Sequence, residues 1–170
     1  VSINGVSNAV FAQLGGVGND SAKIKIVAGN NIDLSGTGTA VAAVNLNEPD
    51  SDSTAAVALT GKNVTIKSSG GKGLGSYAAG GGGSNAKTSA VVNAEGTVTI
   101  EGATNAVHAA NGKNAGDAFI SIDAGEAINI SGGQNALYSG SNALVKINDG
   151  GTAKVSLTGN VVAENGGQII

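Results

Sequence analysis

Short runs in which apolar and polar residues alternate recur along the whole chain. Positions 118 to 139 contain three of them, at 119–122, 128–130 and 135–138, separated by glycine-containing corners. Alternation with a period of two places successive side chains on opposite faces of a β-strand. Three such runs joined by two tight corners predict one turn of a coil.

The middle run of this unit returns about every 31 residues. Its copies start at Val1, Ile32, Val64, Val98, Ile128 and Val155, in steps of 31, 32, 34, 30 and 27 residues. Such a period indicates a fixed unit joined by loops of variable length. The sequence therefore predicts an all-β fold, a single parallel β-solenoid (β-helix) over residues 1–170 with five to six coils and three short strands per coil. We expect a right-handed coil, since crossovers between parallel strands are nearly always right-handed.

Stacking the coils aligns equivalent positions into columns. At the corner before the third run, an inward polar column is expected to form a structural hydrogen-bonded ladder: Asn8, Thr39, Asn105, Asn135 and Asn160. The outward column of the middle run is small and polar: Ser2, Asp33, Thr65, Thr99, Asn129 and Ser156. In the next outward column, two residues further along the same strands, Lys67 and Glu101 should form an exposed ion pair. The first run should present Lys25, Ala58, Asn93, Ser121 and Lys146.

The outward column of the third run differs, because it gathers most of the rings in the chain. It is predicted to contain Phe11, Ala42, Tyr77, His108, Tyr138 and Ala163. Exposed aromatic rows are typical of surfaces that bind a glycan or another protein, so Phe11, Tyr77, His108 and Tyr138 form a candidate binding face. The alternative is that these rings only cover neighbouring loops or strands, and a slip of one residue would bury them.

Two loops could bind calcium. Residues 15–20 match the start of the G-G-x-G-x-D nonapeptide and end at Asp20, but that motif works in tandem and occurs here once. The acids Glu48, Asp50 and Asp52 could supply oxygen ligands. A plain glycine-rich loop and a solvated acidic loop are the favoured interpretations, so these four acids are weak candidates and no metal or cofactor is expected.

Composition narrows the classes of partner. The chain has 29 Gly, no Cys, and aromatic residues at only 2%, which suits small aliphatic side chains stacked coil on coil. The net charge is −3 and every basic residue is Lys, which argues against a nucleic-acid partner. No apolar run approaches the roughly 20 residues that span a bilayer, so no transmembrane segment is predicted.

The residues also argue against an enzyme. His108 is the only histidine, and its expected neighbours, Tyr77 or Gly75 and Tyr138, are not acidic, so a Ser-His-Asp arrangement is not predicted. Glu95 and Glu126 sit at corners about one coil apart without a supporting base, and Arg is absent. A carbohydrate-active hydrolase or lyase on a β-helix remains an alternative.

The repeated pattern A-x-I-x-I…G-x-x-I-x-I-S-G-x-x-N-A-V/L-x-A, which is best preserved at 22–43, 118–139 and 143–163, covers essentially the whole chain. It resembles the passenger domains of bacterial autotransporter adhesins. The resemblance implies a secreted, right-handed β-helix at the cell surface of a Gram-negative bacterium, anchored by an outer-membrane barrel that lies outside this chain. Such passengers act in self-association, adhesion and virulence. The family shares a scaffold rather than a site, so no functional residue is transferred.

The leading hypothesis is therefore a surface-exposed structural or adhesive solenoid that attaches cells through a repetitive face, by self-association or by binding a host or cell-surface protein or glycan. Both ends lack the polar caps that solenoids need, which predicts either a segment of a longer repeat protein or a subunit of an extracellular fibre or surface layer. Ice binding by the Thr65 and Thr99 column is the least favoured alternative, because other residues interrupt that column.

Overall fold

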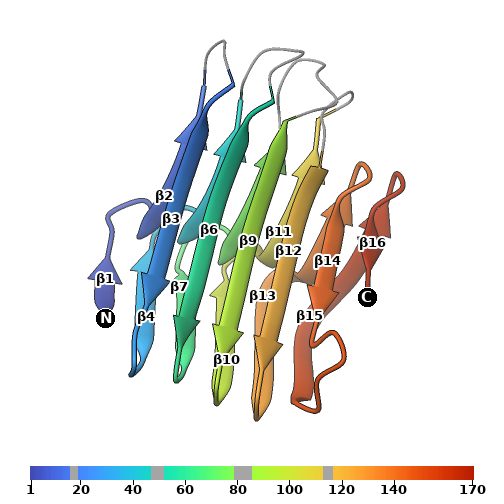
Figure 1. The fold of residues 1–170 in the computed structure, drawn as a ribbon. Helices are drawn as coiled ribbons and strands as arrows, with labels where there is room; N and C mark the ends of the chain where they lie inside the picture. Colours follow the sequence, from blue (N-terminus) through green and yellow to red (C-terminus); the bar gives the residue numbers. More distant parts are fainter. Residues whose placement is uncertain (16–18, 47–51, 79–85, 113–116) are drawn as a thin grey trace.

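The fold of this chain is seen in a computed structural model that describes residues 1–15, 19–46, 52–78, 86–112 and 117–170. The described regular structure is all β, and neighbouring strands are parallel. The strands formed by the first run of each repeat make one sheet: β3 (Ser21–Val27), β6 (Thr54–Gly61), β9 (Lys87–Ala94), β12 (Asp117–Ala124), β14 (Leu144–Ile147) and β16 (Gln168–Ile169). This sheet lies in front in Figure 1.

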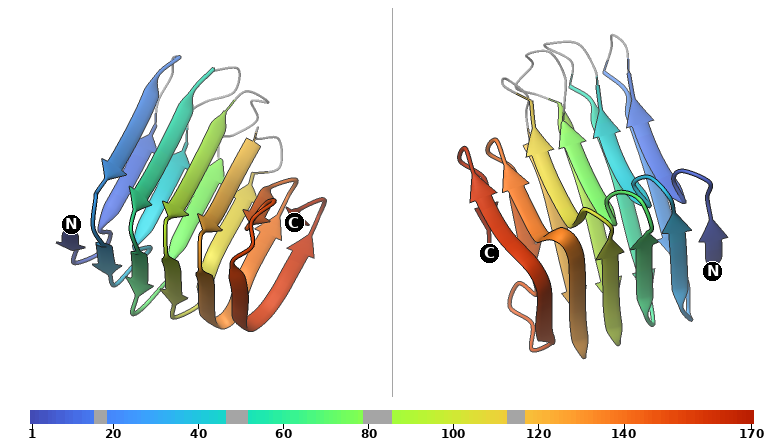
Figure 2. Two further views of the ribbon diagram at one scale, coloured as in Figure 1. Left: turned by 60° about the horizontal axis from the view of Figure 1, so that its bottom comes forward. Right: turned by 180° about the vertical axis from the view of Figure 1, so that it is seen from behind.

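The other two series belong to a second sheet that packs behind the first (Figures 1 and 2). The middle series contains β1 (Ser2–Asn4), β4 (Ile32–Gly36), β7 (Val64–Ser68) and β10 (Thr97–Gly102). The third series contains β2 (Val10–Leu14), β5 (Val41–Asn45), β8 (Leu74–Ala78) and β11 (Asn105–Asn111). Two strands serve both series, β13 (Ala127–Gly140) and β15 (Lys154–Glu164). The chain is thus a parallel β-solenoid, as predicted.

The coil count differs from the prediction. The described chain forms about four turns with three separate strands, from β1 to β12, rather than five to six. In the last two passes the corner between the middle and third strands is extended, so β13 and β15 run through it without a break. The corner persists there only as register shifts between Ser131 and Leu137.

The middle strands stack in the predicted register. Asp33 pairs with Ser2 and with Thr65, and Thr99 pairs with Thr65 and with Asn129. This column is therefore confirmed. The first strands differ at one position, because Val91 rather than Asn93 pairs with Ala58 and Ser121.

The core is a set of aliphatic columns between the two sheets. Ile66, Ile100 and Ile130 are almost completely buried, and each contacts its equivalents in the next turns. Burying a side chain of this size stabilises the fold by about 1.5–3 kcal/mol. Leu74 takes the inward place in the third turn, as predicted. In the last pass, by contrast, Val155 is 41% exposed and Leu157 is 39% exposed.

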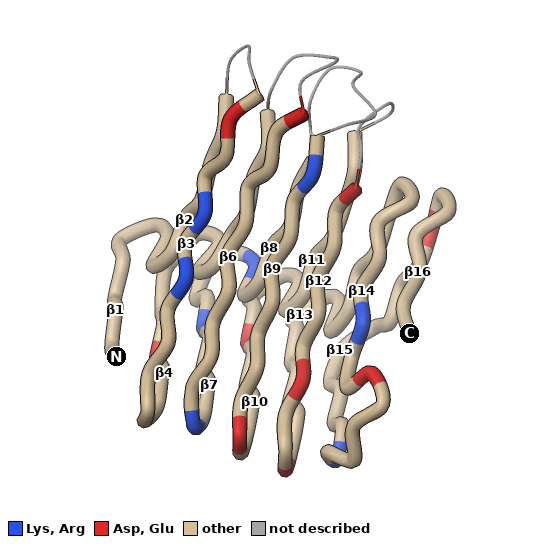
Figure 3. The backbone as a smooth tube through the Cα atoms, viewed as in Figure 1, with Lys and Arg blue, Asp and Glu red and all other residues tan. Residues whose placement is uncertain are grey.

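Charged residues are scattered over the turns and strands, with both signs interspersed (Figure 3). The predicted ion pair forms between Lys67 Nζ and Glu101 Oε1 at 3.0 Å, on the outer face of the middle strands. Within the described ranges, no helix is long and apolar enough to cross a membrane.

Candidate functional site

The aromatic face lies on the outer side of the third strands, but its register differs from the prediction at two positions. His108 of β11 pairs with Tyr138 of β13, as expected. On its other side it pairs with Gly75 rather than with Tyr77, and Tyr138 pairs with Val162 rather than with Ala163. His108 lies ten residues after Val98, whereas its partner Gly75 lies eleven residues after Val64, so the glycine-containing corner before β8 holds one extra residue. Tyr77, the predicted member of the column, lies two residues beyond Gly75.

Tyr77 nevertheless joins the aromatic face, because its ring folds back over Gly75. A Cβ atom added at Gly75 would lie 2.4 Å from Tyr77 Cε2 and 2.6 Å from its hydroxyl oxygen. Gly75 is therefore the residue whose missing side chain makes room for the ring. The same arrangement recurs two turns later, where a Cβ at Gly140 would lie 2.8 Å from the hydroxyl of Tyr138.

These side chains form a continuous row of three rings. The ring centroids of Tyr77 and His108 are 5.2 Å apart, and those of His108 and Tyr138 are 4.4 Å apart. Both pairs are tilted, a geometry that stabilises aromatic pairs by about 0.5–1.5 kcal/mol beyond their buried area. The aromatic row, as we call Tyr77, His108 and Tyr138, is half-buried and is carried by three successive turns.

Phe11 does not belong to the aromatic row. It is 39% exposed and pairs with Ala42, which in turn pairs with Gly75. The turn that carries Ala42 thus separates Phe11 from the ring of Tyr77. The predicted face is continuous over three of its four rings.

A chain of amide hydrogen bonds positions the imidazole in the row. Asn135 Nδ2 donates to Asn105 Oδ1 at 2.9 Å, and Asn105 Nδ2 donates to His108 Nδ1 at 2.6 Å. Because Nδ1 accepts this bond, the neutral ring carries its proton on Nε2. Asn105 is buried, and its amide bonds both to Asn135 in the next turn and to His108 in its own strand.

The electrostatics of the row favour neutral groups. Burial, with a smaller contribution from the charge of Lys72, lowers the pKa of His108 to about 4. Burial also raises the pKa of Tyr77 and lowers the pKa of Lys72, whose Nζ lies 4.8 Å from the centroid of the Tyr77 ring. A hydrogen bond to Glu164, together with burial and the charge of that carboxylate, raises the pKa of Tyr138. At neutral pH the three rings are therefore uncharged, with the ammonium of Lys72 over the Tyr77 end and the carboxylate of Glu164 bonded to Tyr138 at the other.

The polar ladder is shorter than predicted. Asn105, Asn135 and Asn160 are in register, but the side-chain hydrogen bond described above joins only the first two, and Asn160 is exposed. Among the described residues, no side-chain hydrogen bond links Asn8 or Thr39 to this ladder. A second asparagine step, which the sequence analysis missed, lies at the opposite corner, where Asn63 Nδ2 donates to Asn31 Oδ1 at 3.0 Å.

The weak metal candidates are only partly described. Glu48 and Asp50 lie outside the described residues, as do positions 16–18 of the glycine-rich motif. Asp20 and Asp52 are described, and the backbone N–H of Asp52 donates to Asn19 Oδ1 at 2.8 Å. Among the described residues there is no group of three or more His, Cys, Asp or Glu side chains that could hold a metal ion.

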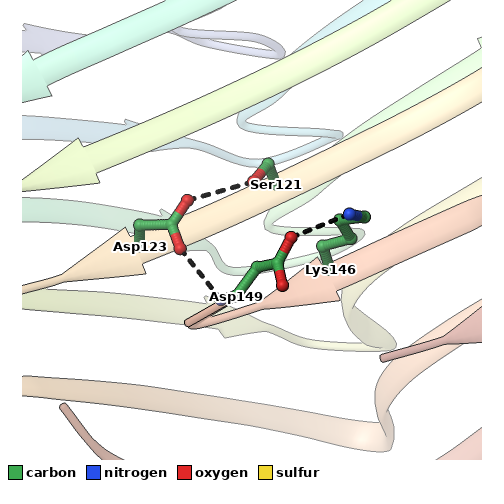
Figure 4. Close-up of polar contacts among 4 residues, drawn as sticks. All are labelled: Ser121, Asp123, Lys146 and Asp149. Atoms are coloured by element: carbon green, nitrogen blue, oxygen red, sulfur yellow. Dashed lines mark hydrogen bonds and ion pairs between the residues drawn. The ribbon is translucent and has the colours of Figure 1, made fainter. Parts of the chain in front are cut away.

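A polar cluster on the outer face of the first sheet was also missed (Figure 4). Asp123 accepts hydrogen bonds from the hydroxyl of Ser121 and from the backbone N–H of Asp149, both at 3.1 Å. Lys146 Nζ contacts Asp149 Oδ2 at 2.7 Å. The alternation of Ser121 and Asp123 on β12 could have indicated part of this cluster. The polar groups of this cluster bond to one another, and these bonds hold the turn that follows β14.

Comparisons of this chain with protein families, with curated proteins and with solved structures found no match. The aromatic row therefore has to be interpreted from its own geometry.

Proposed function

We propose that this solenoid is a surface-exposed structural and adhesive element, and that it attaches cells or surfaces through the outer face of its third strands. The observation that carries the proposal is the aromatic row, in which three successive turns bring their rings into contact at 5.2 and 4.4 Å. The neighbouring outer face of the middle strands holds short polar side chains instead. An uncharged aromatic strip beside a polar face is typical of a contact surface.

The proposed mechanism is multivalent. Three successive turns each add one ring to the row; the register pairs His108 with Tyr138, and the space at Gly75 lets the ring of Tyr77 join them. Weak contacts from a rigid repetitive face are strengthened when many of them form together. The partner would be a second copy of this chain, or a protein or glycan on another cell.

The location of the protein is part of the same proposal. The likeness of the repeat pattern to autotransporter passengers supports export to the surface of a Gram-negative bacterium. It also supports a right-handed coil, which is the usual hand of parallel crossovers.

The test couples the chain to beads and measures their clustering by light scattering. The variant carries His108→Ser and Tyr138→Ser, and the matched control carries Thr99→Ala and Asn129→Ala on the polar face. We expect the ring variant to lose most of the clustering and the control to keep it. Thermal unfolding of both variants checks that the fold is retained.

Equal clustering by the ring variant and the wild type would show that this face is wrong. If the wild-type beads do not cluster, the same pair of variants is tested for binding to cultured cells and to immobilised glycans. Loss of binding only in the ring variant would then identify a partner of another kind, and no binding in either assay would contradict adhesion.

A further inference from the structure

A hollow of about 470 Å³ lies where β12, β14 and β16 begin, on a different part of the surface from the aromatic row. We propose that it binds a neutral saccharide of one or two units. Its lining combines an aromatic ring, a leucine, two amides and one carboxylate: Phe119, Leu144, Asn142, Gln168 and Asp117.

The apolar part of the hollow comes from the parallel register of the first sheet. Phe119 pairs with Leu144, and Leu144 pairs with Gln168, so the three side chains follow one another across the sheet. Phe119 and Leu144 are both partly exposed. A ring beside an aliphatic side chain offers an apolar platform for the C–H face of a sugar, and Gln168 ends this platform with an amide.

The polar part depends on two stacked turns. Asn142 has a φ of 62°, and its backbone N–H donates to the carbonyl of Asn165 in the next turn at 3.2 Å. Gly166 has a φ of 82°, and a Cβ added there would lie 2.1 Å from Asn142 Oδ1. The absence of a side chain at Gly166 thus leaves the space in which the amide of Asn142 lies.

A second hollow of about 380 Å³ also includes Asn142 in its lining, together with Ser141, Asn165 and Gly112. Its hydrogen-bonding side chains are again neutral. Asn142 therefore lines both hollows, and each has a volume within the range of about 300–1,000 Å³ that is usual for sites of small ligands.

The chemistry of the lining selects the ligand class. Amides both donate and accept hydrogen bonds, and the carboxylate of Asp117 accepts them, which matches the hydroxyl groups of a sugar. Neither Lys nor Arg is among the described residues that line the two hollows, so an anionic ligand would meet no counter-charge. The many polar groups also disfavour a purely apolar ligand, whose binding would leave them without partners.

The experiment is saturation-transfer NMR with cellobiose, N,N′-diacetylchitobiose and lactose, and with 3′-sialyllactose as the anionic partner of lactose. We expect transfer to the ring protons of at least one neutral sugar, and weaker transfer to sialyllactose than to lactose. Asn142→Gly should weaken binding about tenfold, the loss expected for one or two hydrogen bonds. Glycine is the suitable substitute here because it tolerates the positive φ.

Phe119→Leu and Asp117→Asn provide two further variants, which keep the apolar character and the size of the side chain respectively. Tyr138→Ser is the control, because it alters the aromatic row and leaves the hollow intact. Binding lost in Tyr138→Ser but kept in Asn142→Gly would overturn the proposal and assign the sugar to the aromatic row. No transfer to any of the three neutral sugars, or stronger transfer to sialyllactose, would also overturn it.

This inference does not depend on adhesion through the aromatic row. The bead assay tests His108 and Tyr138, whereas the NMR experiment tests Asn142, Phe119 and Asp117. Either result can fail while the other stands.

Discussion

The middle and third strands belong to one parallel sheet, but the side chains on their outer faces are positioned in different ways. On the middle strands, Thr65 and Thr99 pair directly, and the neighbouring positions in the same column also hold short polar side chains. On the third strands, Tyr77 reaches its neighbour His108 only by folding over the empty position at Gly75. In the first case the backbone register alone places the side chains, and in the second a missing side chain decides where the ring lies.

The difference has an energetic consequence. Short polar side chains that face water contribute little to stability, so the middle face should tolerate substitution within about 0.5 kcal/mol. The rings of the third face are packed against each other and against glycine, so a change of one methyl group matters there.

The largest effect should follow Gly75→Ala. The new methyl group would occupy the place of the Tyr77 ring, which would have to swing outward and leave His108. We expect the free energy of unfolding to fall by about 1–2 kcal/mol, from the lost ring contact and the lost packing. Urea unfolding measures it, with Thr99→Ala on the middle face as the control.

A second substitution, Tyr77→Ala, should reverse the effect of Gly75→Ala on the free energy of unfolding. In a Tyr77→Ala background the space at Gly75 is empty, so Gly75→Ala should no longer destabilise. It should instead stabilise by about 0.4–1 kcal/mol, because alanine restricts the unfolded chain. A loss of stability in both backgrounds would show that Gly75 is needed for its backbone and not for the ring.

The side-chain columns of the middle strands could be predicted from the sequence, whereas the aromatic column of the third strands could be predicted only in part. The triplets from Ile32 to Ile128 repeat without insertions between their own residues, so their columns could be aligned by inspection. The glycines around position 71 carry no alternation, so the start of β8 could not be located to within two residues. That Tyr77 folds back over Gly75 depends on side-chain packing, which no spacing rule contains.

The C-terminal hollow could not have been found from the sequence. The pairing of Phe119 with Leu144 follows from the predicted alignment of Ser121 with Lys146, but nothing in the spacing shows that Asn142 and Gly166 complete a hollow beside them. In the sequence, Gly166 is one of two adjacent glycines, a pattern that indicates a corner and nothing more specific. Its relation to Asn142 requires the two turns to be stacked.

A separate effect is expected from pH. The pKa of His108 is lowered to about 4 in the fold, from about 6.5 in the unfolded chain, so the unfolded state binds more protons between these values. This contribution to stability is complete above about pH 6.5 and is lost as the pH falls toward 4. Urea unfolding from pH 7 to pH 4 should therefore show a steeper decline for the wild type than for His108→Gln.

The glutamine variant keeps an amide that can bond to Asn105 but has no group that titrates in this range. The carboxylates titrate in both proteins, so only the difference between the two curves is informative. Parallel curves would mean that His108 is as well solvated as in the unfolded chain.

The smallest effect should come from the ion pair on the middle face. Lys67 and Glu101 are 3.0 Å apart, but their side chains are 52% and 45% exposed. A double-mutant cycle with Lys67→Ala and Glu101→Ala should give a coupling below about 1 kcal/mol that declines as salt is added. A larger coupling that resists salt would contradict the view that this face contributes little to stability.

The parallel ladder also determines how the molecule would respond to force. Backbone hydrogen bonds between successive turns point along the axis of the solenoid, from Ser2 and Asp33 at one end to Leu144 and Gln168 at the other. Tension between the two termini would load these rows one after another rather than all together. The turns should then detach singly, and each would release about 30 residues, or roughly 100 Å of extended chain. A rod built in this way would lengthen in steps under load, as an extensible tether.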